Sequence, residues 1–240
     1  MRENFVNGKI YHLYNRGADK RPIVCDEHDR FRFVRSLFEF NDIDSRPNPI
    51  RSSKIQSVEV GLQQIGKYKK EEKRESRKLL IDIIAFCLMD NHYHLMVRQR
   101  VDGGISKFVQ KFGTGYTHYF NQRHERSGVL FQGKFKSVLV SGDSQFNFLP
   151  LYIHANPLDK KFKGWREKEM ENPKQAIEFL KKYRWSSFLD YVGIKNFPSV
   201  TQRELLLEYF GGERNVEKMF EQWLKDMNED WNDRKRITFE

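Results

Sequence analysis

The sequence predicts an α+β fold of the ferredoxin-like type, in which a split βαβ arrangement forms an antiparallel sheet with helices on one face. Three observations predict it. The segments follow the order strand, helix, strand, strand, helix, strand, and then a further helix. Two apolar strand-like runs are separated by a short polar turn, and apolar residues recur at helical spacing in the two intervening segments. Because such a fold hosts many activities, function must be inferred from particular side chains.

The first part of the chain predicts one strand, one helix and an insertion. Residues 8–16, GKIYHLYNR, combine aromatic and β-branched side chains and end at Gly17, as a strand does. Residues 27–41 carry apolar side chains at helical spacing and follow Asp26, which suits a helix N-cap. The block at about 43–78 joins a proline- and serine-containing loop to the charged run KYKKEEKRESRK, and predicts a solvent-facing insertion.

A hairpin and an amphipathic helix follow the insertion. The runs LLIDIIAFCLM and HYHLMVRQ are both strand-like, and the Asp90-Asn91 pair between them suits a tight turn. Residues 104–123 place large aromatic side chains on one helical face, although two glycines weaken that helix.

The last elements of the pattern are a strand and several helices. Residues 128–140 end in a strand pattern, and residues 143–156 predict a helix that Asp143 caps and that stops before Pro157. Two more helical patterns follow beyond residue 200. We therefore expect a main domain over 1–160 and a mostly helical extension over 161–240.

Composition restricts the functional class. The chain has 240 residues, with 43 Lys+Arg against 33 Asp+Glu, so its formal charge is +10. This surplus favours a polyanionic partner, most simply a nucleic acid. No apolar run approaches the length of a membrane span, and the first residues lack the apolar core of a signal peptide. Two cysteines, Cys25 and Cys87, are too few for a disulfide framework or a four-thiolate zinc site. We expect a cytoplasmic protein with no membrane partner.

His92 and His94 are the first candidates for chemistry, with Tyr93 between them. Alternate side chains of a strand share a face, so both imidazoles can point at one metal ion. An isolated His-x-His is more often an ordinary pair of strand histidines. Histidines are uncommon without a partner inside a core-forming hairpin, which favours the functional interpretation here.

Tyr152 and Asn156 lie four residues apart on a predicted helix and therefore share a face. Of the ten tyrosines, only Tyr152 and Tyr11 have Asn or Gln four residues later. The Tyr11 pair falls on a strand, where such positions lie roughly 13 Å apart. Only the helical pair can bring a phenol and an amide oxygen to one point. The alternative is that Tyr152 packs in the core and Asn156 ends the helix.

Three segments together resemble the HUH single-tyrosine transposases, specifically the REP-associated tyrosine transposases. They are LMDNHYHLMV, YTHYFNQRHERSGVLFQGKFKSVLV and YIHANPLDK, and they occur in the order found in that family. The resemblance spans about residues 8–193. It implies that 1–160 is the catalytic domain, that His92, His94 and Asn156 bind Mg²⁺ or Mn²⁺, and that Tyr152 is the nucleophile.

The implied reaction is cleavage of single-stranded or hairpin DNA, with a covalent 5′-phosphotyrosine and a free 3′-OH, followed by strand transfer in reverse. A phenol with an ordinary pKa near 10 is a poor nucleophile, so help from a divalent ion at the scissile phosphate makes chemical sense. The family resemblance is compatible with a monomer or a homodimer. A non-catalytic protein that binds structured DNA or RNA on the same fold is the main alternative, and a metal-dependent hydrolase that activates water is a third possibility.

Basic and aromatic residues interleave around the RSGVLFQGKFK segment, as in proteins that bind single strands with cations on phosphates and rings on bases. The candidate DNA-binding residues are Arg123, Arg126, Lys134, Lys136 and Phe131. A solvated loop is the alternative interpretation. Tyr116 and Tyr119 are rival nucleophiles, but their helical spacing among other aromatic residues favours core packing.

Overall fold

The computed structural model describes residues 4–44, 77–166 and 170–238. The sheet has four antiparallel strands in the order β2-β3-β1-β4. The strands are β1 (Ile10–Arg16), β2 (Ile81–Leu88), β3 (His92–Gln99) and β4 (Lys136–Leu139). The helices are α1 (Glu27–Phe40), α4 (Gly104–Arg123), α5 (Asp143–Ala155), α6 (Pro173–Leu180), α7 (Phe188–Tyr191), α8 (Glu204–Phe210) and α9 (Glu213–Thr238). Two short 3₁₀ turns, η1 (Ala18–Lys20) and η2 (Asn156–Lys160), complete the described elements.

The predicted fold class is confirmed. The elements β1, α1, β2, β3, α4 and β4 follow one another in the expected order, and β1 pairs with both β3 and β4. The predicted insertion falls mostly on residues 45–76, which lie outside the described residues. In the described part of the chain, no helix combines the length and the apolar character that crossing a membrane requires.

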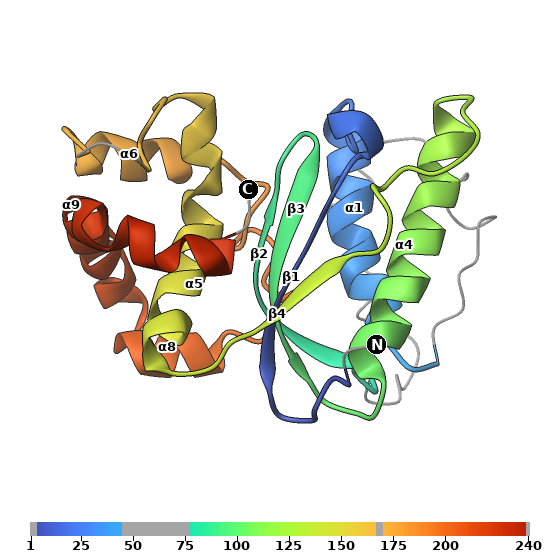
Figure 1. The fold of residues 1–240 in the computed structure, drawn as a ribbon, viewed down its shortest axis with the longest axis horizontal. Coiled ribbons are helices and arrows are strands. Elements are labelled where there is room, and N and C mark those ends of the chain that lie inside the picture. The colour runs from blue at the N-terminus through green and yellow to red at the C-terminus, as the bar shows by residue number, and fades with distance from the viewer. Residues whose placement is uncertain (1–3, 45–76, 167–169, 239–240) are drawn as a thin grey trace.

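Helices cover both faces of the sheet, whereas the sequence pattern predicts one covered face. Figure 1 shows α1 and α4 on one side, and α5 with the C-terminal helices on the other. The physical reason lies in β2, where all eight residues are buried. A strand that is apolar on both faces must be covered on both faces.

An aromatic core fills the space between the sheet and helices α1 and α4. Phe33 on α1 packs edge-on against Phe112 and Tyr116 on α4, with ring centroids 4.9 and 5.1 Å apart. The two helices approach closely at Gly115, where an added Cβ would lie 2.3 Å from the ring of Phe40. This close contact accounts for a glycine in the middle of α4. Asp26 caps α1 as predicted, because its carboxylate accepts a hydrogen bond from the amide of Asp29 at 3.0 Å.

The opposite face is covered by α5, which the C-terminal helices enclose in turn. Phe148 on α5 lies 5.8 Å from Trp223 on α9, measured between ring centroids. The C-terminal part of the chain also contacts the sheet directly, because the amide of Leu88 donates to the carbonyl of Trp185 at 2.9 Å. Segments on either side of residue 160 thus pack together, and the division at that residue stays a prediction.

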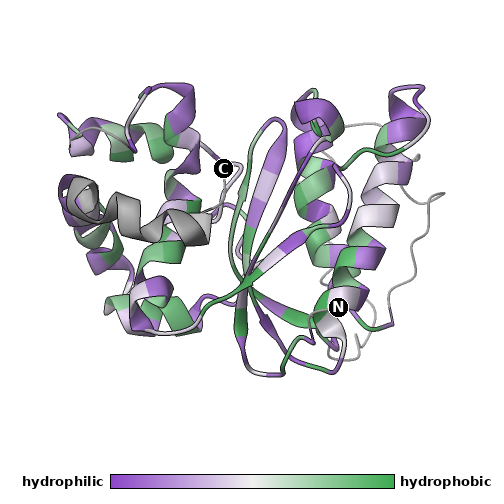
Figure 2. Ribbon diagram, viewed as in Figure 1, coloured by the Kyte–Doolittle hydropathy of each residue, from purple (hydrophilic) through white to green (hydrophobic). Residues whose placement is uncertain are grey.

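Helix α5 begins differently from the prediction. Gly142 occupies the N-cap position, without a side-chain hydrogen bond, and Asp143 is the first helical residue. The helix contains Pro150, which lacks an N–H and therefore cannot bond to the carbonyl one turn earlier. The helix still continues to Ala155. In Figure 2, hydrophilic residues colour the end of β3 next to the β2–β3 turn.

Candidate functional site

The alternation of β3 sends its side chains to opposite faces of the sheet. Tyr93 points into the aromatic core, where its ring centroid lies 5.4 Å from that of Phe33 and 5.7 Å from that of Phe112. His92 and His94 therefore face the α5 side, with ring centroids 5.1 Å apart. The local pattern of the sequence thus places the two predicted metal ligands side by side.

Helix α5 brings Tyr152 to this pair. The Tyr152 ring meets His94 edge-on, with 5.7 Å between centroids, and stacks against Phe148 one turn earlier on the same helix. Tyr152 is 0% exposed and His94 is 3% exposed. The candidate nucleophile is consequently enclosed by protein on every side.

Asn156 completes the group of four predicted residues. It is buried at the start of η2, and its side-chain Nδ2 donates to the backbone carbonyl of Tyr152 at 2.9 Å. A carbonyl can only accept, so this bond fixes the amide and turns Oδ1 away from the helix. The Asn156 side chain lies close enough to His92 to oppose the lowering of that histidine's pKa, and its Oδ1 lies 3.4 Å from Nη2 of Arg166. The predicted phenol, two imidazoles and amide therefore converge.

Burial keeps both strand histidines neutral. It lowers the pKa of His92, and it lowers the pKa of His94 well below the ordinary value, helped by the neighbouring His12 and His92. A neutral imidazole has the lone pair that a metal ion requires. Two neutral imidazoles and an amide oxygen suit a divalent cation and leave its full charge for a phosphate.

Two residues of β1 join the site beside His94. Nε2 of His12 lies 2.9 Å from Nδ1 of His94, and the Tyr14 ring stacks on His94 with 6.0 Å between centroids. Burial raises the pKa of the Tyr14 hydroxyl to about 12. The alternation of β1 places His12 and Tyr14 on one face, but the pairing of β1 with β3, which brings them to His94, cannot be deduced from the sequence alone.

Arg166 is a further site residue that the sequence motifs do not reveal. Its guanidinium carbon lies 5.7 Å from the centroid of the Tyr152 ring and 4.8 Å from that of Trp165. An ion pair with Asp159 holds it in place. Arg166 follows η2 in an irregular segment, where no periodic pattern could have indicated its position. It supplies a positive charge next to the candidate nucleophile.

Two of the five candidate DNA-binding side chains contact other side chains of the protein. Arg123 donates to the carboxylates of Asp26 and Asp29 at 2.7 and 2.6 Å, so a DNA phosphate would have to compete with both. Phe131 is partly buried against the aromatic core, with its ring centroid 5.7 Å from that of Tyr93. The physical reason in both cases is that α4 and the loop after it pack back onto the sheet and α1.

The other three candidates lie closer to solvent. Lys134 and Lys136 are exposed, and the Arg126 guanidinium lies over the Phe120 ring at 5.4 Å. Lys136 pairs with Tyr14 across the β1–β4 ladder, and Tyr14 pairs with His94 across the β1–β3 ladder. Directly paired residues share a face of the sheet, so His94, Tyr14 and Lys136 form one row from the buried site to the sheet edge.

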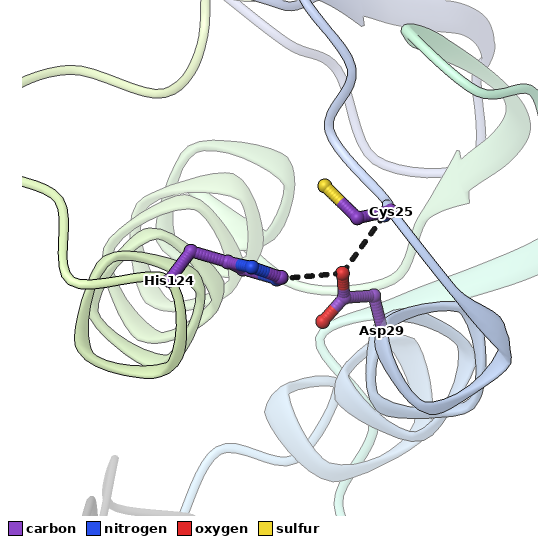
Figure 3. Close-up of side chains that lie close together, drawn as sticks. All are labelled: Cys25, Asp29 and His124. Atoms are coloured by element: carbon purple, nitrogen blue, oxygen red, sulfur yellow. Dashed lines mark hydrogen bonds and ion pairs between the residues drawn. The ribbon is translucent and has the colours of Figure 1, made fainter.

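A second group of metal-binding residue types surrounds Asp29 on the other face of the sheet. Cys25, Asp29 and His124 offer ligand atoms that lie within 4.8 Å of one another (Figure 3). However, the fully buried carboxylate already accepts four hydrogen bonds. The donors are the Tyr119 hydroxyl at 2.9 Å, Arg123 at 2.6 Å, the Cys25 amide at 2.8 Å and His124 at 2.8 Å. We interpret this group as a network that joins α1 to α4. Tyr119 belongs to it, and Tyr116 is buried in the adjacent core, as predicted for these rival tyrosines.

A family model described as "Transposase IS200 like" matches residues 62–156. The matched segment contains both strand histidines and Tyr152, and it ends at Asn156. This segment is similar to the IS200-like transposases, and the resemblance to transposases indicated by the sequence motifs is confirmed.

No curated protein matches the chain. Three chains of solved structures do match it. One of them, described as "Structure of the REP associates tyrosine transposase bound to a REP hairpin", shares 11% identity with this chain. The similarity covers 82% of this chain and 88% of that one, with a TM-score of 0.47. This score is too low to establish a shared fold, so the similarity to transposases rests on the family-model match over residues 62–156.

Proposed function

We propose that this protein cleaves and rejoins single-stranded DNA through a covalent bond to Tyr152, with a divalent cation bound by His92, His94 and Asn156. The convergence of these four side chains from β3, α5 and η2 is the observation that supports the proposal. Within the IS200-like family, the sequence motifs favour the REP-associated branch. Hairpin-forming DNA is therefore the proposed substrate, and Mg²⁺ or Mn²⁺ the proposed cation.

In the proposed reaction, the Tyr152 oxygen forms a bond to the phosphorus of a phosphodiester. The bond from phosphorus to the 3′ oxygen breaks, the phenol loses its proton, and the departing oxygen gains one to become a 3′-OH. A bound divalent cation would polarise the phosphate and offset its charge. Arg166 adds a positive charge close to the tyrosine. Because the protein–DNA ester conserves the phosphodiester energy, attack by a 3′-OH restores the strand without ATP.

Access to Tyr152 requires a rearrangement, since the side chain is completely buried. Helix α5 is the element that must shift relative to the sheet. Pro150 interrupts its hydrogen bonding two residues before the nucleophile, which lowers the resistance of the helix to bending there. The row from His94 through Tyr14 to Lys136 gives a DNA strand a route from the sheet edge to the opened site.

Trapping the covalent adduct tests the proposal. The full chain is incubated with a fluorescently labelled pool of single-stranded oligonucleotides that includes hairpins, with Mn²⁺, and denaturing gels then detect DNA attached to protein. We expect an adduct in the native protein and in Tyr14→Phe, but none in Tyr152→Phe. Tyr14 is the matched control, because it is the other tyrosine in ring contact with His94. Peptide mass spectrometry identifies the modified residue.

The complete burial of Tyr152 favours one alternative, a protein that binds structured nucleic acid without cleaving it. Binding of the same oligonucleotides without any adduct would support that alternative and contradict the proposal. Cleavage without an adduct that persists in Tyr152→Phe would indicate a hydrolase that uses activated water.

A further inference from the structure

His12 contacts His94 in the site, although it lies outside the three segments that carry the closest resemblance to the transposases. Nε2 of His12 lies 2.9 Å from Nδ1 of His94, and both rings are buried. The two rings are nearly parallel, at 20°. Tyr14 lies against both of them, with centroids 5.0 Å from His12 and 6.0 Å from His94. This packing restricts the rotation of the two imidazoles.

A hydrogen bond between two neutral imidazoles has one donor and one acceptor, so two arrangements are conceivable. If Nε2 of His12 carried the proton, Nδ1 of His94 would accept it. His94 would then be protonated at Nε2 and would have no lone pair left for a cation. If His94 carries its proton at Nδ1 and donates to His12, Nε2 of His94 keeps its lone pair. Only the second arrangement is compatible with His94 as a ligand.

We propose that His12 is a positioning residue that accepts the Nδ1 proton of His94 and thereby orients Nε2 of His94 for the cation. This inference rests on the proposed function of the site. A metal-bound histidine usually donates its other ring N–H to a carbonyl or carboxylate, which fixes the tautomer and the ring orientation. Here the acceptor of that N–H is an imidazole nitrogen, Nε2 of His12. Losing such a partner typically weakens metal binding by about 10- to 100-fold.

Three substitutions of His12 separate hydrogen bonding from packing. In His12→Gln, the amide reaches about as far as Nε2 of histidine and retains an acceptor for His94. His12→Asn is equally polar, but its amide occupies the position of Nδ1 and falls short. His12→Leu fills similar space without any acceptor. The Gln and Asn variants form the matched pair. Comparing their His94 tautomers and Mn²⁺ affinities tests the role of His12 even if His12→Leu does not fold.

The first measurement uses the metal-free protein with ¹⁵N-labelled histidine. We expect His94 to carry its proton on Nδ1 in the native protein and in His12→Gln. In His12→Asn and His12→Leu, we expect the Nε2-protonated form that free imidazole side chains prefer. The second measurement is Mn²⁺ affinity, followed by electron paramagnetic resonance without DNA. We expect it to fall about 10- to 100-fold in the Asn and Leu variants, and to stay near the native value in the Gln variant.

A native protein with His94 protonated at Nε2 would overturn the inference, as would equal Mn²⁺ affinity in the Gln and Asn variants. Equal affinity would also be expected if His12 only filled space. Failure of the native protein to bind Mn²⁺ at all would instead contradict the proposed function. The tautomer measurement would still decide the role of His12, because it needs no metal.

Discussion

The Tyr152 ring meets the His94 ring edge-on, with an angle of 83° between the ring planes. This contact joins a helix to a central strand, and it depends on how α5 docks against the sheet. Phe148, one turn before Tyr152, contacts both the tyrosine and Trp223 of α9. The position of the candidate nucleophile is thus coupled to the packing of the C-terminal helices.

Lys136 should contribute to DNA binding through charge alone. It is exposed and shares a row of the sheet with Tyr14 and His94. Because each phosphate contact on a single strand releases about 0.7 of a counterion, we expect Lys136→Ala to reduce the slope of log affinity against log salt by about 0.7. Fluorescence anisotropy between low and moderate salt measures this slope. Lys195, an exposed lysine after α7, is the control. Equal slopes for the Lys136 and Lys195 variants would exclude the proposed route for the strand.

Arg166 should affect the chemical step more than metal binding. Replacing it by Gln keeps a hydrogen-bond donor near Asn156 but removes the charge beside Tyr152. Since a fixed cation near developing negative charge is worth about 10²-fold in rate, we expect adduct formation to slow by about that factor. Mn²⁺ affinity should stay within about twofold of the native value, because a guanidinium has no lone pair with which to coordinate a cation.

Rapid-quench sampling of the adduct measures the rate in the Arg166 variant. Arg184 is the matched control, because its guanidinium also lies over aromatic rings, 4.7 Å from Phe31 and 5.2 Å from Trp185. An equal loss of rate in Arg184→Gln would mean that the effect comes from weakened packing and not from the charge at Tyr152.

The sequence predicts most of the scaffold, because strand and helix periodicities are local. The helix over 104–123 and the turn at Asp90-Asn91 agree with the structure. The covered second face is harder to predict, since an apolar run such as β2 can have one or two buried faces. Likewise, the capping of α5 depends on Gly142, whose φ of 105° no pattern in the sequence specifies.

The candidate site likewise contains residues that local spacing predicts and residues that only long-range packing places there. His92 and His94 follow from strand alternation, and Tyr152 with Asn156 follows from helical spacing, although their roles came from the family resemblance. His12 reaches the site only through the register between β1 and β3. Arg166 reaches it through an irregular segment after η2. Long-range register and loop geometry are decided by packing, so a single sequence does not reveal them.

Asp29 should be critical for stability, whereas its neighbour Asp26 should not. Asp29 is fully buried and bound to Arg123, while the Asp26 side chain is 45% exposed. Breaking a buried ion pair costs about 3–5 kcal/mol, so we expect a loss of that order in Asp29→Asn. Asp26→Asn should cost less than about 1 kcal/mol, because exposed pairs contribute little and Asn caps helices as well as Asp does. Urea unfolding measures both variants, and similar losses would contradict the assignment of Asp29 as the centre of the network.

His154 should make the protein sensitive to acid. Its Nε2 lies 2.8 Å from the Ser187 hydroxyl, and burial lowers its pKa to about 3. Between pH 6.5 and about 3, the unfolded chain therefore binds a proton at this residue that the folded chain excludes, so stability falls as the pH falls. The stability that comes from keeping His154 neutral and buried is fully present above pH 6.5, the pKa of this residue in the unfolded chain. Within the window it is lost by up to about 1.4 kcal/mol per pH unit.

The substitution His154→Gln tests this prediction, because Gln can still bond to Ser187 but does not titrate. We expect the slope of unfolding free energy against pH, measured in urea with a chelator present, to decrease by up to about 1.4 kcal/mol per pH unit between pH 6 and 4. His118, an exposed histidine on α4, is the control, and its replacement by Gln should leave the slope near the native value. An unchanged slope in His154→Gln would mean that water or a rearrangement of α5 lets the buried ring accept a proton without unfolding.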